Sequence, residues 1–146
     1  MDKEPEWDGF ILIYNSKDQK NSHMDCRINV QVKGKVVKHF LEKEKYSIKL
    51  TSLKNYLKEG GCLFFVVEEI ENDTRIFYVK LTPSKIRNIL KYKANQTTNS
   101  FKHCRVTPDI NNFIDEMRIF HSDCNKQISY EAVLSKGAFT IKIGNV

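Results

Sequence analysis

The most hydrophobic segment of the chain, Cys62-Leu-Phe-Phe-Val-Val67, constrains the fold more than any other feature. Gly60-Gly61 precedes it and the turn-forming pair Asn72-Asp73 follows it. A short apolar run bounded by turn residues is typical of a strand that is buried on both faces. The segment 75–81 then returns as its hairpin partner. The sequence therefore predicts a sheet centred on residues 62–69.

Hydrophobic periodicity places further elements before and after this hairpin. Strands are expected at 9–15, 27–37 and 46–50, and another over 100–106. A helix is expected over 52–59, with Thr51 or Ser52 as its cap and Gly60-Gly61 at its end. Thr82-Pro83 predicts the start of another helix, whose apolar stripe is Ile86, Ile89 and Leu90.

Pro108 predicts a last helix over 109–121, with one apolar face formed by Ile110, Phe113, Ile114, Met117 and Phe120. In the tail, 128–146, only Phe139–Ile143 alternates like a strand. Strands and helices alternate along a chain of 146 residues, which fits one domain. The expected fold class is α/β, with α+β as the alternative, around one mixed sheet over residues 1–146.

Composition narrows the location and leaves the partner open. The chain has no apolar run long enough to span a bilayer, and its polar start, Met1-Asp-Lys-Glu4, is unlike a signal peptide. We therefore expect a cytoplasmic protein without membrane contact. The net charge of +6 allows an anionic partner such as nucleic acid, but a solvated basic surface explains it more simply.

The four cysteines are scattered, as in intracellular proteins, and Cys62 is expected to be a buried thiol. His23-x-x-Cys26 and His121-x-x-Cys124 have zinc-ligand residue types at close spacing. The two pairs are far apart in sequence, and neither contains a Cys-x-x-Cys knuckle. Unrelated loop and surface residues are the preferred interpretation.

The strand expected at 27–37 carries two polar residues, Gln31 and Lys33, on one face. In Arg27-Ile-Asn-Val-Gln-Val-Lys-Gly34, Gln31 and Lys33 are two residues apart and share one face, while Val30 and Val32 point the other way, into a core. Asp8 stands at the head of the preceding strand. An aspartate beside a Gln/Glu-x-Lys pair on the next strand is a layout that can hold a divalent metal against a phosphate.

These residues resemble a known family. Trp7-Asp8-Gly9, then Gln31-Val-Lys-Gly34, then the helix ending at Gly60-Gly61 before a hydrophobic strand are similar to a bacterial domain-of-unknown-function family. That family belongs to the PD-(D/E)XK nuclease superfamily, near the Mrr-like restriction endonucleases. The resemblance covers residues 1–125 and implies a restriction-endonuclease-like mixed central sheet flanked by helices.

The resemblance also implies roles for individual residues. Asp8, Gln31 and Lys33 match the catalytic positions. Asp8, the Gln31 amide and the Val32 carbonyl would bind Mg²⁺, with Mn²⁺ as an alternative. Lys33 would position the attacking water or offset charge in the transition state. Four lysines that follow the motif in the sequence would track the DNA backbone: Lys35, Lys38, Lys54 and Lys58.

Two departures from the family pattern leave the activity open. Gln31 is neutral, which weakens a metal site. Family members carry a helix, often with a glutamate, before the aspartate strand, whereas only seven residues precede Asp8 here. The chain is then a fragment, does without that helix, or receives it from a partner in a homodimer or larger assembly.

The expected function is Mg²⁺-dependent hydrolysis of DNA phosphodiester bonds in bacterial restriction or antiphage defence. The first alternative is a catalytically inactive module of the same fold that binds nucleic acid or a protein. The second is a small structural or regulatory protein in which Asp8 forms only a turn, and Gln31 and Lys33 are ordinary polar residues of an exposed sheet face.

Overall fold

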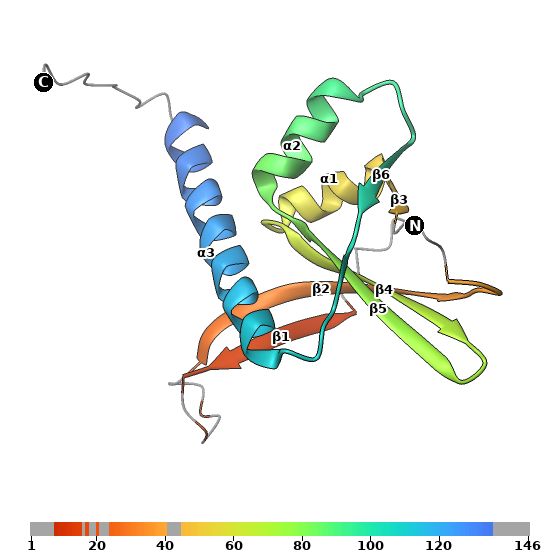
Figure 1. Ribbon diagram of the computed structural model, residues 1–146. Helices are drawn as coiled ribbons and strands as arrows, with labels where there is room; N and C mark the ends of the chain where they lie inside the picture. The colour runs from red at the N-terminus through yellow and green to blue at the C-terminus, as the bar shows by residue number, and fades with distance from the viewer. Residues whose placement is uncertain (1–7, 16, 18–19, 21–23, 41–44, 136–146) are drawn as a thin grey trace, which may run out of the picture.

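The computed structural model describes residues 8–15, 17, 20, 24–40 and 45–135. Its strands and helices follow one another in the order shown in Figure 1. The strands are β1 (Gly9–Tyr14), β2 (Met24–Val36), β3 (Lys45–Lys49), β4 (Cys62–Ile70), β5 (Asp73–Leu81), β6 (Thr98–Lys102) and β7 (Cys104–Arg105). The helices are α1 (Leu50–Lys58), α2 (Pro83–Tyr92) and α3 (Ile110–Ser135).

The main sheet is mixed and has the strand order β1-β2-β4-β5-β7. β2 and β4 are parallel, and the other pairs are antiparallel. The connection between the parallel pair contains β3 and α1, as a crossover requires. β3 pairs with β6 in a second, two-stranded sheet. The predicted mixed α/β class, with the hydrophobic strand 62–69 in the middle of the sheet, is confirmed.

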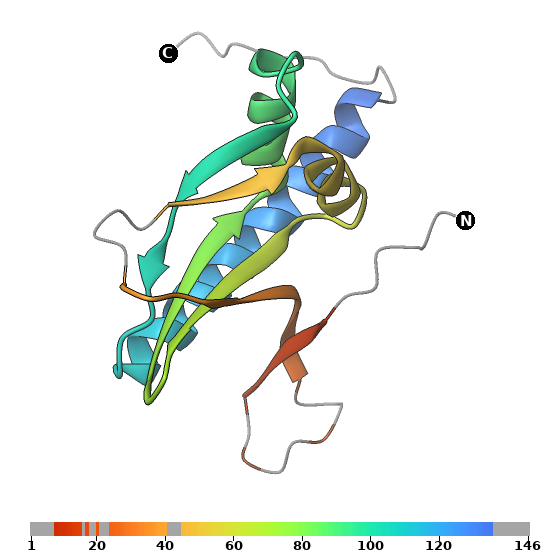
Figure 2. The same cartoon turned by 90° about the vertical axis from the view of Figure 1, so that its right-hand side faces the viewer.

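Each face of the main sheet has its own hydrophobic core. On one face, Phe64 and Val66 of β4 pack with Leu53 and Tyr56 of α1 and with Ile86 of α2. On the other face, a second cluster joins the sheet to α3. It contains Ile13, Cys26, Ile28, Val30, Leu63, Tyr78, Met117, Phe120 and Cys124. Figure 2 shows α3 running behind the sheet, with the β3–β6 pair in front of it.

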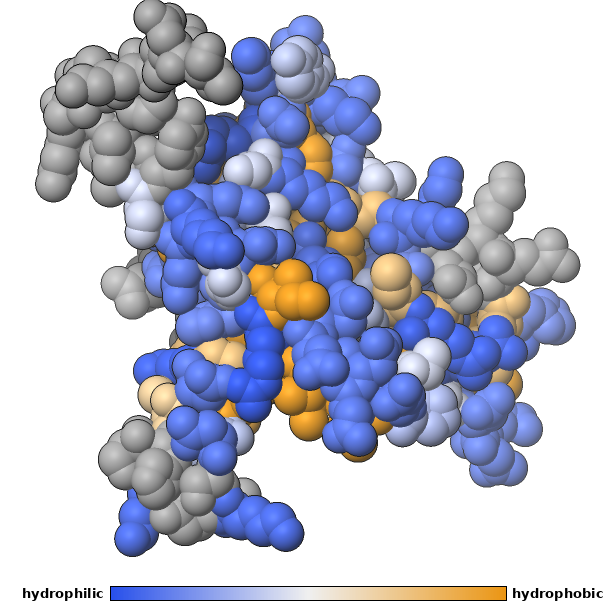
Figure 3. Space-filling view, turned by 60° about the vertical axis from the view of Figure 1, so that its left-hand side comes forward, coloured by the Kyte–Doolittle hydropathy of each residue, from blue (hydrophilic) through white to orange (hydrophobic). Residues whose placement is uncertain are grey.

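The surface on the α3 side is largely hydrophilic. Figure 3, which brings that side forward, shows hydrophobic residues mainly in the middle of the view. Within the described residues, no helix is both long enough and apolar enough to cross a membrane.

The helix boundaries follow from local chemistry at two sites. Thr82 caps α2, since its hydroxyl oxygen accepts a hydrogen bond from the Lys85 backbone N–H at 3.3 Å, and Pro83 occupies the first turn. Gly60 and Gly61 follow α1 with φ angles of 85° and 105°. These left-handed values favour glycine, which explains why α1 ends where the sequence predicts.

The predicted start of α1 was wrong. Leu50 is the first helical residue rather than the end of a strand, and Lys49 precedes the helix without a side-chain cap. Thr51 and Ser52 therefore lie inside the helix. The Leu50 backbone N–H instead donates to the Thr97 carbonyl at 2.9 Å. A distant backbone oxygen thus replaces the cap that the sequence placed locally.

Other corrections concern edges of the fold. Val32 is 40% exposed rather than core, and it lies beyond the residue pairs of β1, which begins where Gly9 meets Val30. Ile110, in the first turn of α3, is 65% exposed, although it lines the same surface pocket as Phe113 and Ile114 of the predicted apolar face. The predicted strand 100–106 is divided between β6 and β7, which belong to different sheets.

The last helix extends to Ser135, well beyond the predicted end at 121. The strand expected at Phe139–Ile143 lies outside the described residues.

Candidate functional site at the head of β1

Asp8 meets the second strand through two hydrogen bonds. Its Oδ2 accepts from the Gln31 side-chain Nε2 at 2.5 Å and from the Val32 backbone N–H at 2.7 Å. Gly9 pairs with Val30, so extending the antiparallel register by one residue sets Asp8 opposite Gln31. The carboxylate therefore takes the N–H that the strand ladder leaves unpaired beyond Gly9. Asp8, Gln31 and Val32 come together as the sequence predicted.

The same geometry sets the position of the Val32 carbonyl. In an extended strand, the N–H and C=O of one residue point to the same edge. Because the Val32 N–H points to Asp8, its carbonyl oxygen also faces the β1-side edge of β2, just beyond the Gly9–Val30 pair. The Asp8 carboxylate and the Val32 carbonyl are thus directed to one small region.

The Gln31 amide offers its nitrogen to Asp8, as it must beside a carboxylate that can only accept. Binding of a cation by both side chains would require the amide to turn over and present its oxygen. The terminal torsion of glutamine is broad and two-fold, so this rotation costs little. The donor set is then one carboxylate, one amide oxygen and one backbone carbonyl, which are the hard oxygen ligands that Mg²⁺ accepts.

Only part of a metal site is present among the described residues. They contain no group of three or more His, Cys, Asp or Glu side chains arranged to hold a metal. Asp8 would be the single negatively charged ligand. The set fits a cation that keeps most of its waters and binds weakly until a phosphate adds further oxygens.

None of the predicted lysines forms a hydrogen bond or an ion pair with Asp8 within the described residues. Lys33 and Lys35 are exposed and share the Gln31 face of β2, as strand alternation requires. Lys38 follows the strand and is also exposed. Lys54 and Lys58 are exposed residues of α1, which packs on that same face of the sheet.

Two buried groups close to Asp8 were predicted only as core residues. Burial raises the pKa of Tyr56 to about 12, and the neighbouring Cys62 and Asp8 charges add to this effect. Burial also raises the pKa of the Cys62 thiol, although a hydrogen bond with the Gln31 backbone opposes the shift. Both groups are therefore neutral at physiological pH.

The zinc-like pairs of the sequence do not form a site in the described residues. His23 lies outside them. Cys26 and Cys124 are both buried in the α3-side core, so they are not the loop or surface residues that were expected. His121 forms a hydrogen bond with Asn125 at 3.4 Å, and burial lowers the pKa of its ring.

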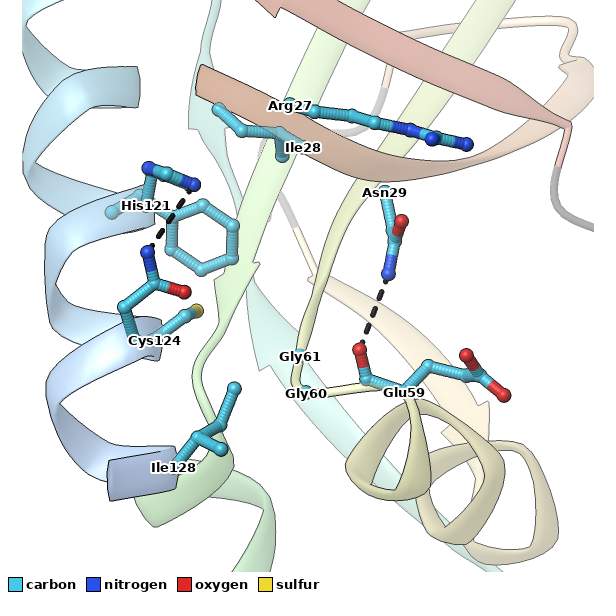
Figure 4. Close-up of a pocket in the computed structure, with 11 residues that line it drawn as sticks. Arg27, Ile28, Asn29, Glu59, Gly60, Gly61, His121, Cys124 and Ile128 are labelled. Carbon is cyan, nitrogen blue, oxygen red and sulfur yellow. Dashed lines mark hydrogen bonds between the residues drawn. The ribbon is translucent and has the colours of Figure 1, made fainter. Parts of the chain in front are cut away.

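A small cavity of about 100 Å³ separates His121 from the end of α1. Figure 4 shows Asn29 of β2 pointing towards α1, where its side-chain nitrogen donates to the Glu59 carbonyl at 3.3 Å. His121 and Cys124 line the opposite wall. This volume is far smaller than ordinary ligand pockets, which begin near 300 Å³. We assign this cavity no ligand.

No protein-family model matches the chain, and neither a curated protein nor a solved structure matches it. The interpretation of the site therefore rests on the residues themselves.

Proposed function

We propose that the chain is a nuclease-fold domain that binds the DNA backbone at Asp8, Gln31 and Lys33 and hydrolyses phosphodiester bonds with Mg²⁺. The observation that supports this most directly is the pair of hydrogen bonds from Gln31 and Val32 to the Asp8 carboxylate. Asp8 meets Gln31 and Val32, which lie 23 and 24 positions further along the chain, at the β1-side edge of β2. A carboxylate and a backbone carbonyl are available there, and the Gln31 amide would add a third oxygen after turning over.

Each residue has a distinct part in the proposed chemistry. The cation, when bound, polarises the scissile phosphate and lowers the pKa of a coordinated water. Asp8 would supply the charge that holds it, and the Gln31 amide and the Val32 carbonyl would be further oxygen ligands. Lys33, on the Gln31 face, places its ammonium group to orient the water or to offset the developing phosphate charge.

The site as described has one acid, so we propose that a second acid completes it. Glu4 and Glu6 precede Asp8 in the sequence but lie outside the described residues. A partner chain in a homodimer or larger assembly is the other source. A bacterial defence setting, in which foreign DNA is the substrate, agrees with the proposed chemistry.

The test is cleavage of plasmid and linear DNA with Mg²⁺ or with EDTA. We expect cleavage by the wild-type chain with Mg²⁺ only, and a loss of roughly 100-fold or more in Lys33→Ala, as for removal of one transition-state donor. Lys126→Ala on α3 is the matched control and should cleave normally. Equal cleavage by the wild type and Lys33→Ala would indicate a contaminating nuclease and refute the proposal.

A DNA-binding module without hydrolysis is the second candidate, and the single carboxylate among the described site residues favours it. It predicts binding of uncut DNA both with Mg²⁺ and with EDTA. A thermal-shift measurement tests the metal site directly, whether or not the chain cleaves or binds DNA. Mg²⁺ should raise the melting temperature of the wild type but not of Asp8→Asn, because ligands stabilise only the state that binds them.

A further inference from the structure

A second candidate site lies at the opposite edge of the main sheet from Asp8. A cavity of about 230 Å³ is enclosed by the end of β5, the first turn of α2, the β6–β7 segment and α3. Three lysines line it, one from each of three elements: Lys80 of β5, Lys85 of α2 and Lys102 of β6. They come together only in the folded chain, since each belongs to a different strand or helix.

The acids nearby neutralise this cavity only in part. Lys80 Nζ contacts Glu116 Oε2 of α3 at 2.6 Å. Asp123 also lines the cavity. Among the described residues, however, no ion pair within 4.0 Å joins Asp123 to any of the three lysines. Lys85 and Lys102 are therefore cations without a fixed carboxylate partner in the described part of the chain.

Lys85 carries a charge that its surroundings disfavour. Desolvation by burial lowers the pKa of Lys85, and the nearby Lys80 charge acts in the same direction, although Cys104 opposes the shift. The ammonium group also lies 5.6 Å from the centre of the Phe101 ring. A desolvated cation beside a like charge is costly unless an anion compensates it.

The first turn of α2 supplies one further donor but no free backbone N–H. Pro83 has none, the Ser84 N–H donates to Gln127 Oε1 at 2.9 Å, and the Lys85 N–H donates to Thr82 Oγ1. Because the Thr82 hydroxyl accepts that bond through its oxygen, its own hydrogen can be donated into the cavity. Side chains, not helix N–H groups, would therefore bind a ligand here.

We propose that this cavity binds a phosphate group, held by Lys85 and Lys102 with the Thr82 hydroxyl as a further donor. A volume of about 230 Å³ is below the range of about 300–1,000 Å³ typical of drug-sized ligands, so the group that enters is one phosphate. The phosphate is either free or the end of a small phosphate ester whose remainder projects outward. This site does not depend on the activity proposed at Asp8.

The cavity contains its own reporter. Cys104 lines it and is exposed, whereas Cys26, Cys62 and Cys124 are buried. The experiment follows alkylation of the native full chain by neutral iodoacetamide, with the adduct located by mass spectrometry. Sodium phosphate is compared with sodium chloride at equal ionic strength. With a dissociation constant near 1 mM, about 10 mM phosphate should slow alkylation of Cys104 roughly tenfold.

Variants separate the site from general charge effects, and each is judged by its own ratio of rates with and without phosphate. Lys85→Met should lose the protection, while Lys91→Met, at the other end of α2, should keep it. Asp123→Asn should strengthen the protection, because it removes a negative charge from the cavity. No protection in the wild type, or equal protection in Lys85→Met, would overturn the proposal.

Phosphorus NMR of inorganic phosphate with the wild-type chain gives an independent measurement that needs no variant. Broadening of the phosphate line by the protein, reversed by excess sulfate, supports the site. A phosphate line that the protein leaves unchanged argues against it. A parallel alkylation series with thymidine monophosphate identifies the source of the phosphate. Stronger protection by the nucleotide supports an ester ligand, and stronger protection by inorganic phosphate supports the free ion.

Discussion

At the residue scale, Asp8 has a structural task that exists without any metal. Its carboxylate accepts a hydrogen bond from the Val32 N–H just before β1 begins, and it also accepts one from the Gln31 amide. A loss of activity in an Asp8 variant alone therefore does not demonstrate catalysis. The ligand role requires an additional response to Mg²⁺, which a purely structural carboxylate does not give.

Buried thiols give the chain a predictable response to alkaline pH. Burial, with a smaller contribution from Asp123, raises the pKa of Cys124 from its ordinary value of 9.0 to about 12. A group with a raised folded-state pKa contributes stability that is complete below its unfolded pKa and is lost as pH rises through the folded value. Cys124 should therefore destabilise the fold progressively between about pH 9 and pH 12.

We expect the free energy of unfolding to fall above pH 9, by up to about 1.4 kcal/mol per pH unit for each such thiol. Urea unfolding from pH 8 to pH 11 measures this slope. Cys124→Ala should have a shallower slope, whereas Cys104→Ala, which alters an exposed thiol, serves as the comparison. An identical slope in Cys124→Ala and the wild type would contradict the assignment.

At the element scale, the turn between α1 and β4 depends on the second of its two glycines. Gly61 has a φ of 105°, and an added Cβ would lie 2.8 Å from the Leu81 carbonyl oxygen and 2.9 Å from Cys124 Sγ. Gly61→Ala should therefore cost about 2 kcal/mol or more from backbone strain and the clash with a backbone atom.

Gly34→Ala is the matched control, because nothing lies within 4 Å of its added Cβ and it belongs to a strand. We expect that substitution to change stability by no more than about 1 kcal/mol. Thermal and urea unfolding of both variants provide the measurement. Equal losses of stability would mean that glycine replacement itself, rather than the geometry at Gly61, is responsible.

The elements that sequence reasoning located correctly are those with local causes. Thr82-Pro83 marks the start of α2 and Gly60-Gly61 the end of α1 through their own backbone chemistry. The succession of strands and helices along the chain follows from hydrophobic periodicity. The start of α1 was missed because its first N–H is satisfied by Thr97, 47 residues away. A pattern confined to neighbouring residues does not contain such a contact.

The same distinction applies to the two sites. The sequence motif placed Asp8 and Gln31 on neighbouring strands and so predicted that they meet. The contact with the Val32 N–H depends in addition on where β1 begins. The lysine cavity had no sequence motif, since β5, α2 and β6 each supply one of its lysines.

At the scale of the whole molecule, a single helix, α3, is the packing partner for one face of the sheet. Met117 of α3 is fully buried against β-strand residues, while Ile119, two positions along the same helix, is 56% exposed. Met117→Ala should lower the free energy of unfolding by about 2–5 kcal/mol, because it removes buried volume from the α3-side core.

Ile119→Ala removes a similar side chain from the outer side of α3 and should change stability by about 0.5 kcal/mol or less. Both variants are compared by urea unfolding, with the slope of the transition checked for two-state behaviour. If the two substitutions were equally costly, α3 would not pack on the sheet as described.

The net charge of +6 gives the whole-molecule test of the proposed DNA interface. The lysines expected to follow the backbone lie on the Gln31 face of the sheet and on α1, which covers that face, whereas Lys126 is an exposed residue of α3 on the other face.

Each phosphate contact contributes about 0.9 to the slope of log affinity against log salt. We expect Lys54→Ala and Lys58→Ala each to reduce the slope by about that amount, and Lys126→Ala to leave it unchanged, in fluorescence-anisotropy titrations of duplex DNA. An equal effect of all three substitutions would mean that DNA responds to net charge alone, and the proposed interface would have to be abandoned.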